Sequence, residues 1–241
     1  MQISEITRDD TLRSTVPYGT AEFPFECYLD QLEHYKSRCV EWHWHSELQF
    51  SCVLDGSVTA CIGSDRVAMQ TGDGLFINSG AIHRFESGGT GRLVNLIFSP
   101  GFLAPQGSVL FLKYVAPFLA SDCGYLSLRR VREPDRSLLE RMEEIDQAAR
   151  WEDFLRELRI HNLTSLLWQE LAEHAIERLS PVPSHGGRLV QIRLQTSMPA
   201  MHSASPWRRS RPAPASASAR RCGAFIPGYR PRRSSTSMTT A

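Results

Sequence analysis

The sequence predicts an α+β protein in which antiparallel β-strands precede α-helices. Up to Pro100, short runs of β-branched and aromatic residues alternate with turns that contain Gly, Asp or Ser, a pattern typical of a β-barrel or β-sandwich. After Pro100 the apolar residues recur at three- and four-residue steps, which is the period of a helix. The 241 residues are 41% apolar and 22% charged, a composition typical of a globular protein.

The expected location is the cytoplasm, with no membrane partner. No stretch approaches the ~20 apolar residues of a membrane helix, and the acidic start of the chain has no apolar signal core. The six cysteines are scattered with no C-x-x-C pair, which disfavours a zinc ribbon or a disulfide scaffold and fits a reducing compartment.

The strand region is expected to form one barrel over residues 25–100, after a loosely ordered lead-in over residues 1–24. The runs with strand character are Phe25–Leu32, Arg38–His45, Glu47–Leu54, Ser57–Ile62, Arg66–Gln70, Gly74–Asn78, His83–Glu86 and Arg92–Phe98. The dipeptide Asp55-Gly56 lies between two of these runs and predicts a hairpin turn.

The helical segment is expected over residues 101–180. Ser108–Leu119 is apolar with a break near Pro117, and Asp135–Arg150 follows a proline that suits a first helical turn. Trp151–Leu179 has the strongest helical pattern, with an apolar stripe made of Ile160, Leu163, Leu167 and Leu171. Such a stripe is typical of core packing. A helix this long after a small barrel also favours a subunit interface, and we predict a homodimer through these residues.

The end of the chain differs from the rest in charge. Residues 181–196 are expected to form a linker and residues 197–241 a disordered tail. From Arg178 onward there are 11 Arg and no acid, while the preceding residues carry 16 basic and 26 acidic groups. The net charge of +1 therefore combines an acidic body with a basic end. An arm that binds nucleic acid is one interpretation of that end.

Histidines gather in the strand region. Because side chains alternate along a strand, residues two apart share one face, and here they are His43, His45, Glu47 and Gln49. His83 follows a turn punctuated by glycines and is expected to join them inside the barrel. Three imidazoles and a carboxylate could bind a first-row metal ion. They could equally bind a polar organic ligand beside an aromatic wall from Phe76 or Phe85.

Two stretches carry a family resemblance: His43-Trp-His-Ser-Glu-Leu-Gln49 with the later Gly56, and Gly72-Asp-Gly-Leu-Phe-Ile-Asn-Ser-Gly-Ala-Ile-His83. They resemble the two motifs of the cupin barrels. Metal-binding cupins have a carboxylate where this chain has Gln49, and usually a proline where it has Asn78. Together with Lys113–Phe118 and the helix from Trp151, the stretches are more similar to the sensor domain of AraC-family bacterial transcription regulators, over roughly residues 25–196.

The resemblance implies a cupin-like barrel (a double-stranded β-helix) that binds a small effector such as a sugar or small acid. It also implies helices that dimerise and a linker to two helix-turn-helix units that bind promoter DNA. The implied effector-binding residues are His43, His45, Glu47, Gln49, Phe76 and His83, with no catalytic residue and no metal or other cofactor. The alternative is a metal-dependent cupin enzyme of dioxygenase or isomerase type, with ligands His43, His45, Gln49 and His83.

The implied DNA-binding half has no counterpart after Gln195, where the sequence has no helical pattern. Ser205–Ser210 can be encoded so that a shifted frame reads Thr-Leu-Glu-Glu-Ile. Ser216–Gly228 can be encoded so that the same frame reads Ser-Val-Ser-Glu-Ala-Leu-Arg-Cys-Phe-His-Thr-Gly. Both peptides resemble the family's first helix-turn-helix. We therefore expect a frameshift near Thr196 and a chain that senses and dimerises but does not bind DNA specifically.

Overall fold

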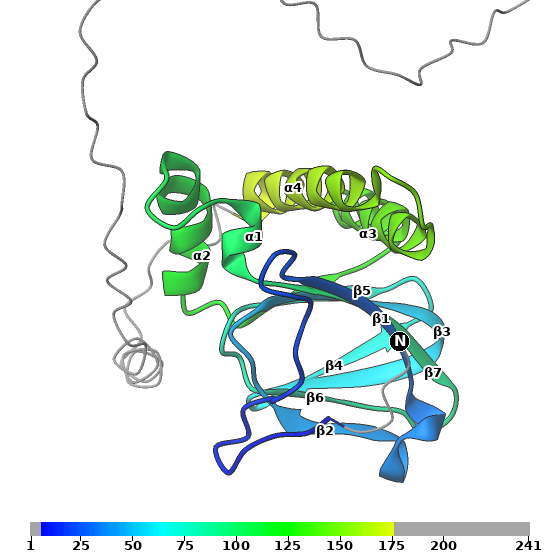
Figure 1. The fold of residues 1–241 in the computed structure, drawn as a ribbon. Helices are drawn as coiled ribbons and strands as arrows, with labels where there is room; N and C mark the ends of the chain where they lie inside the picture. The colour runs from blue at the N-terminus through cyan, green and yellow to red at the C-terminus, as the bar shows by residue number, and fades with distance from the viewer. Residues whose placement is uncertain (1–5, 176–241) are drawn as a thin grey trace, which may run out of the picture. The chain divides into compact units, whose positions relative to one another are not determined.

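The structure, a computed structural model, describes residues 6–175 (Figure 1). The strands are β1 (Phe25–Gln31), β2 (Cys39–His43), β3 (Leu48–Ile62), β4 (Asp65–Gln70), β5 (Gly74–Ile77), β6 (His83–Glu86), β7 (Gly91–Phe98) and β8 (Tyr125–Leu128). The helices are α1 (Pro100–Leu103), a π-helical turn (Phe111–Val115), α2 (Ala116–Ala120), α3 (Asp135–Arg150) and α4 (Arg156–Ala175), and 3₁₀ turns cover Leu32–His34 and Lys36–Arg38. The expected linker, the expected tail and the predicted helical residues 176–179 lie outside the described residues.

The predicted barrel of antiparallel strands followed by helices is confirmed. The long strand β3 connects its two sides. Residues Leu48–Cys52 of β3 pair with β5 and β7, and β1 and β8 extend that side. From Ser57 onward, β3 pairs instead with β4 and β6, and β2 pairs with β6. Within residues 6–175, no helix is long and apolar enough to cross a membrane.

The predicted hairpin at Asp55-Gly56 is wrong, because β3 continues through both residues. The register with β7 shifts between Val53 and Asp55, so this point is a β-bulge that lets one strand pass from one side of the barrel to the other. Gly56 has φ of +82°, and a Cβ there would lie 2.0 Å from the carbonyl oxygen of Thr90. The same positive φ that suits glycine to a tight turn suits it to this bulge.

Strand alternation divides the apolar side chains between two cores. One core fills the inside of the barrel and includes Val53, Leu75, Ile77, Phe85 and Leu93. The other core lies between the outer face of the β1–β7–β3–β5 side and the helices, and it includes Phe50, Phe76, Leu96, Phe98 and Trp168. Figure 1 shows α3 and α4 lying together over that face. Both faces of β5 and of the first part of β3 are therefore buried, which explains the apolar run Leu75–Ile77 in β5, whereas β3 also buries the polar Gln49 and Ser51.

Helix α3 has the predicted bounds, and its apolar side chains Leu138, Leu139, Met142 and Ile145 are buried. The next helix does not begin at Trp151 as predicted. Asp153 accepts a hydrogen bond from the backbone N–H of Leu155 at 2.7 Å, and α4 begins at Arg156. A side chain that satisfies a backbone donor in this way competes with continued helix and favours a helix start, so residues 151–155 connect the two helices.

The apolar stripe of α4 is buried within this chain. Ile160, Leu167 and Leu171 have 0%, 0% and 1% of their surface exposed, and Leu163 packs half-buried against the same core. The chain's own core covers Ile160, Leu167 and Leu171, as the core-packing interpretation of the stripe predicts, so among the expected interface residues only the half-buried Leu163 keeps surface for a second copy. The exposed apolar side chains near and on α4 are Trp151, Phe154, Leu155, Leu158 and Leu166.

Two further segments differ from the expectation. Residues 7–15, expected to be loosely ordered, run along Trp44: Ser14 N–H donates to the Trp44 carbonyl at 2.8 Å, and the Trp44 indole N–H donates to the Thr11 carbonyl at 2.9 Å.

Strand β8 lies in the stretch expected to be helical and pairs with β5. Asn78, at the usual proline position, donates from its side-chain amide to the carbonyls of Phe118 and Cys123, which fixes the segment before β8 to the end of β5.

Candidate functional site

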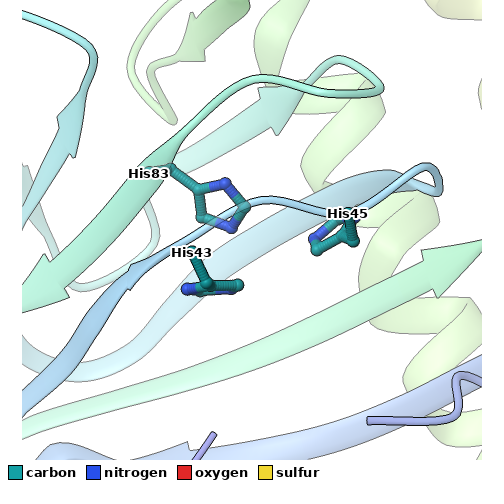
Figure 2. A group of neighbouring side chains, drawn as sticks. All are labelled: His43, His45 and His83. Atoms are coloured by element: carbon teal, nitrogen blue, oxygen red, sulfur yellow. The ribbon is translucent and has the colours of Figure 1, made fainter. Parts of the chain in front are cut away.

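Three buried histidines converge at one end of the barrel (Figure 2). His43 ends β2, His83 begins β6 as its register partner, and His45 lies in the turn before β3. The ring centroids of His43 and His83 are 4.2 Å apart, and those of His45 and His83 are 5.1 Å apart. One nitrogen from each ring lies within 4.8 Å of the others. The rings in Figure 2 point toward one another, so they can act on a single bound group.

Backbone carbonyls fix the tautomers of two of these rings. The Nδ1 atoms of His43 and His83 each lie 2.8 Å from a carbonyl oxygen, of Glu41 and Ala81 respectively. A carbonyl oxygen only accepts, so each Nδ1 carries the hydrogen and each Nε2 keeps its lone pair. The Nε2 atom of His83 is buried and has no hydrogen-bond partner among the described residues. An unpartnered polar atom in a buried position is costly, and a bound group would supply its partner.

Burial keeps these imidazoles neutral. It lowers the pKa of His43 to about 3 and that of His83 well below its ordinary value, and the neighbouring imidazoles lower both further. Burial also lowers the pKa of His45, against the opposing effects of Gln49 and Glu47. At neutral pH the cluster therefore offers uncharged nitrogen donors rather than positive charge.

Gln49 joins the cluster from β3. Its side-chain oxygen lies 2.9 Å from Nε2 of His45, and its amide donates to Ser51 Oγ at 2.9 Å and to Asn95 Oδ1 at 3.1 Å. Glu47 lies at the edge: its carboxylate is 3.8 Å from Nδ1 of His45, and its side chain is 25% exposed. The structure thus brings His43, His45, Gln49 and His83 together and places Glu47 beside them, in a turn rather than on a shared strand face.

Phe76 does not belong to this site. It points to the other face of β5, where it packs against Phe50, Phe118 and Trp168 at ring distances of 5.0, 6.3 and 6.0 Å. A strand buried on both faces has no polar side to show which way a phenylalanine points. The rings that contact the cluster are Tyr18, 5.2 Å from His45, and Phe85, 5.8 Å from His83.

Sequence reasoning missed four polar residues of the barrel interior: Asp30, Tyr35, Ser51 and Asn95. Asp30, Ser51 and Asn95 are at most 1% exposed, and hydrogen bonds connect all four to Gln49. The available signal was weak: Asn95 interrupts the apolar run from Leu93 to Phe98, whereas β1 holds Glu26 and Gln31 as well as Asp30. A buried polar residue is more informative than an exposed apolar one.

The donor set fits a metal ion as well as an organic ligand. Three neutral imidazoles are common ligands of zinc, iron, copper and nickel, and the Nδ1 hydrogen bonds of His43 and His83 are of the kind that orient metal-binding histidines. The carboxylate expected of a metal-binding cupin is replaced by Gln49, whose oxygen already faces His45. His43, His45, His83 and Gln49 are the side chains that would hold such an ion.

Comparison with known proteins agrees with this architecture. Residues 36–98 match the family model of the Cupin domain. The fold is therefore that of a cupin, and the matched region contains all three histidines. Over 172 residues the chain is 29% identical to YdeC of Bacillus subtilis (strain 168), an uncharacterised HTH-type transcriptional regulator. The match covers 70% of this chain and 58% of YdeC, so the chain spans little more than half of that relative.

Two solved structures each resemble part of the chain. An RmlC-like cupin from Shewanella frigidimarina NCIMB 400 is 17% identical with a TM-score of 0.29, covering 32% of this chain and 67% of that one. A predicted oxalate decarboxylase from Thermotoga maritima is 25% identical with a TM-score of 0.25, covering 25% of this chain and 56% of that one.

The neutral histidines predict a loss of stability in mild acid. An unfolded histidine has a pKa of about 6.5, whereas folded His43 has a pKa of about 3. Between these two pH values the unfolded chain is protonated at this position and the folded chain is not. The unfolded state then binds more protons, so the free energy of unfolding falls by up to ~1.4 kcal/mol per pH unit for each such histidine. Urea unfolding between pH 7 and pH 5 should show a shallower pH dependence for His43→Asn than for the wild type. Identical slopes would contradict the assignment.

Proposed function

We propose that this chain is the sensing part of a ligand-responsive transcription regulator of the AraC family, acting in the cytoplasm. A small effector binds inside the cupin barrel, at His43, His45, Gln49 and His83, with Glu47 at the edge. The observation that carries the proposal is the buried His83 Nε2 without a partner, in a chain related to an HTH-type transcriptional regulator. Nitrogen and amide groups that converge in a low-dielectric site are suited to fixing the orientation of a small polar molecule.

Effector binding predicts a thermal shift that depends on the histidines. A ligand at a hundredfold excess over its dissociation constant stabilises the folded state by ~2.7 kcal/mol. In a screen of sugars and small acids, a compound that stabilises the wild type should fail to stabilise His45→Ala or His83→Ala. His174→Ala, at an exposed position of α4, should respond like the wild type.

Equal shifts in all variants would place the ligand elsewhere. The first alternative is a groove of about 610 Å³ between the π-helical turn and α4, lined by Leu110, Tyr114, Trp168 and Ala172 among others. It lies on the helices and not at the histidine cluster.

A metal-dependent cupin enzyme is the second candidate, favoured by the closeness of the three imidazoles. A bound ion would supply Lewis-acid chemistry, and the chain's own residues would hold it and exclude water. Elemental analysis of the purified protein separates the two candidates. Near one iron, manganese or zinc per chain, lost in both His43→Ala and His83→Ala, favours the enzyme.

We propose that the chain forms a homodimer through the exposed side of α4 and the turn before it. Phe154 is 98% exposed, Leu158 57% and Leu166 43%, and the two leucines recur at helical spacing on one face. In a twofold pair, two copies of such a stripe cover each other. A second copy of this chain is the occupant that we propose for this exposed apolar surface.

The homodimer predicts that exposed and buried apolar residues near and on α4 respond differently to substitution: the exposed ones change the oligomeric state, and the buried one changes stability. Light scattering at micromolar concentration should give a dimer for the wild type and a monomer of unchanged circular dichroism for the double variant Phe154→Glu, Leu158→Glu. Leu167→Ala should cost about 2–5 kcal/mol of stability, since Leu167 is fully buried, but leave the dimer mass unchanged. A wild-type monomer at that concentration would contradict the proposed homodimer.

We further propose that this chain does not read DNA sequence, because its residues after Thr196 are out of frame. Specific readout needs a rigid element in the major groove, whereas six prolines after Thr196 interrupt any helix: Pro199, Pro206, Pro212, Pro214, Pro227 and Pro231. Arg side chains alone give salt-sensitive, non-specific attraction with dissociation constants of ~10⁻⁴–10⁻⁶ M.

A competition titration at physiological salt tests this proposal. The full chain and a chain that ends at Gln195 should each bind a promoter no more than ~100-fold better than unrelated DNA. A larger preference for one promoter in the full chain would show that the basic end is a specific reader. Restoring the shifted frame in the gene should create a preference that this chain lacks.

A further inference from the structure

A line of buried hydrogen bonds leads from the histidine cluster to Asp30 along the inner face of the barrel, from one strand to the next. His45 Nε2 lies 2.9 Å from Gln49 Oε1, the Gln49 amide donates to Asn95 Oδ1 at 3.1 Å, and the Asn95 amide donates to Asp30 Oδ2 at 2.9 Å. The four side chains come from the turn after β2 and from the neighbouring strands β3, β7 and β1. Each is at most 3% exposed, so solvent does not compete for these bonds.

Asp30 gives this line a direction. A carboxylate oxygen accepts, so Asn95 must turn its NH₂ group toward Asp30 and its oxygen toward Gln49. Gln49 must then turn its own NH₂ group toward Asn95, which leaves its oxygen facing His45. An oxygen cannot bond a bare ring nitrogen, so Nε2 of His45 carries the hydrogen.

Other contacts reinforce the same direction. The hydroxyl of Ser51 accepts from the Gln49 amide at 2.9 Å and donates to Asn95 Oδ1 at 2.7 Å, which fits the same direction. Tyr35 hydrogen-bonds the other oxygen of Asp30. Burial raises the pKa of Asp30 to about 7, yet a proton on the oxygen that faces Tyr35 leaves Oδ2 as an acceptor for Asn95. The line therefore keeps its direction in the carboxylate and in the acid that is protonated on the oxygen facing Tyr35.

His45 consequently differs from its two neighbours. His43 and His83 donate from Nδ1 to backbone carbonyls and keep a bare Nε2. Nδ1 of His45 also faces a carbonyl, that of Glu47, but at 3.2 Å, which is longer than the 2.9 Å contact with Gln49. Burial favours the neutral form of His45, and a neutral ring carries one hydrogen. The shorter contact and the fixed amide of Gln49 place that hydrogen on Nε2, which leaves Nδ1 bare beside the Glu47 carbonyl.

We propose that Asp30 is a positioning residue of the barrel site, which acts through Asn95 and Gln49 to place the hydrogen of His45 on Nε2. The site then presents two bare imidazole nitrogens, those of His43 and His83, to a ligand. Hydroxyl or amino hydrogens of an effector meet acceptors there, whereas a metal ion can bind Nε2 of His45 only after that nitrogen has lost its hydrogen. The role in effector binding rests on the proposed function, but the hydrogen position does not, because it is measurable without a ligand.

Long-range ¹H–¹⁵N correlation of the full chain, labelled at histidine nitrogens and recorded at pH 7, reads the hydrogen positions directly. His45→Gln, His43→Gln and His83→Gln assign the signals. In the wild type we expect a hydrogen on Nε2 of His45 and bare Nε2 atoms on His43 and His83. A bare Nε2 on His45 in the wild type overturns the proposal, whatever ligand the protein later proves to bind.

Matched variants separate positioning from mere structural support. Asp30→Leu removes the acceptor and should move the hydrogen of His45 to Nδ1, whereas Asp30→Asn keeps an acceptor oxygen and should leave it on Nε2. Tyr35→Phe, which removes only the other partner of Asp30, should also leave it unchanged. Should Asp30→Leu fail to fold, Asn95→Ala breaks the line one residue later and should have the same effect. A folded Asp30→Leu or Asn95→Ala with an unmoved His45 hydrogen contradicts the role of Asp30.

Discussion

The double pairing of β3 is the constraint on which the rest of the molecule depends. One half of this strand belongs to the β1–β7–β5–β8 side and the other half to the β4–β6–β2 side, with the bulge beside Gly56 between them. The strand therefore positions β6, and β6 in turn pairs with β2, so that His83 faces its register partner His43. The alternation of its first half also assigns Gln49 and Ser51 to the inside and Phe50 to the helices.

The inside of the barrel is more polar than stability alone would favour. An unpartnered buried polar atom costs about 1–3 kcal/mol, against a total stability of about 5–15 kcal/mol for a typical domain. His83 Nε2 carries such a cost, while Asp30, Asn95, Ser51 and Gln49 offset theirs by bonding one another. The satisfied groups hold the cluster rigid, and the unsatisfied one marks where binding energy can be gained. Both properties are typical of a pre-organised ligand site rather than of a core selected for packing.

Much of the fold followed from local pattern, and the errors have common physical causes. Period-two alternation and turn residues located the strands, and three- to four-residue spacing located α3, because those signals act over a few residues. Asp55-Gly56 was misread since a positive φ serves a bulge as well as a hairpin. Phe76 and the stripe with Leu167 were misassigned for another reason: spacing shows that a face is apolar, but the partner that covers it is set by tertiary packing.

The candidate site likewise combines residues that local sequence pattern predicts with residues that only tertiary pairing brings together. His43, His45, Gln49 and His83 could be grouped from the sequence because three of them lie close together along the chain and the fourth stood in a recognisable motif. Asp30 and Asn95 could not, since their strands meet β3 only through long-range pairing. The hydrogen on His45 depends on those distant residues, so the chemistry of the site is less local than its composition.

Adjacent residues of β3 lie on opposite faces of the strand, so one contacts the histidine cluster inside the barrel and the next packs in the core between the sheet and the helices. Gln49 contacts His45 inside, and its neighbour Phe50 packs against Phe76 on the outer face, with ring centroids 5.0 Å apart. Phe76 in turn lies 6.0 Å from Trp168 of α4, whose indole N–H donates to the carbonyl of Tyr114 at 3.0 Å. Close-packed interiors do not deform smoothly, so a bound molecule that shifts β3 must either be resisted by this packing or move α4 with it. A ligand influences α4 only to the extent that it binds two such arrangements with different affinity. The fold supplies the short connection, and the polar groups on the inner face of β3 supply the place where that difference can arise.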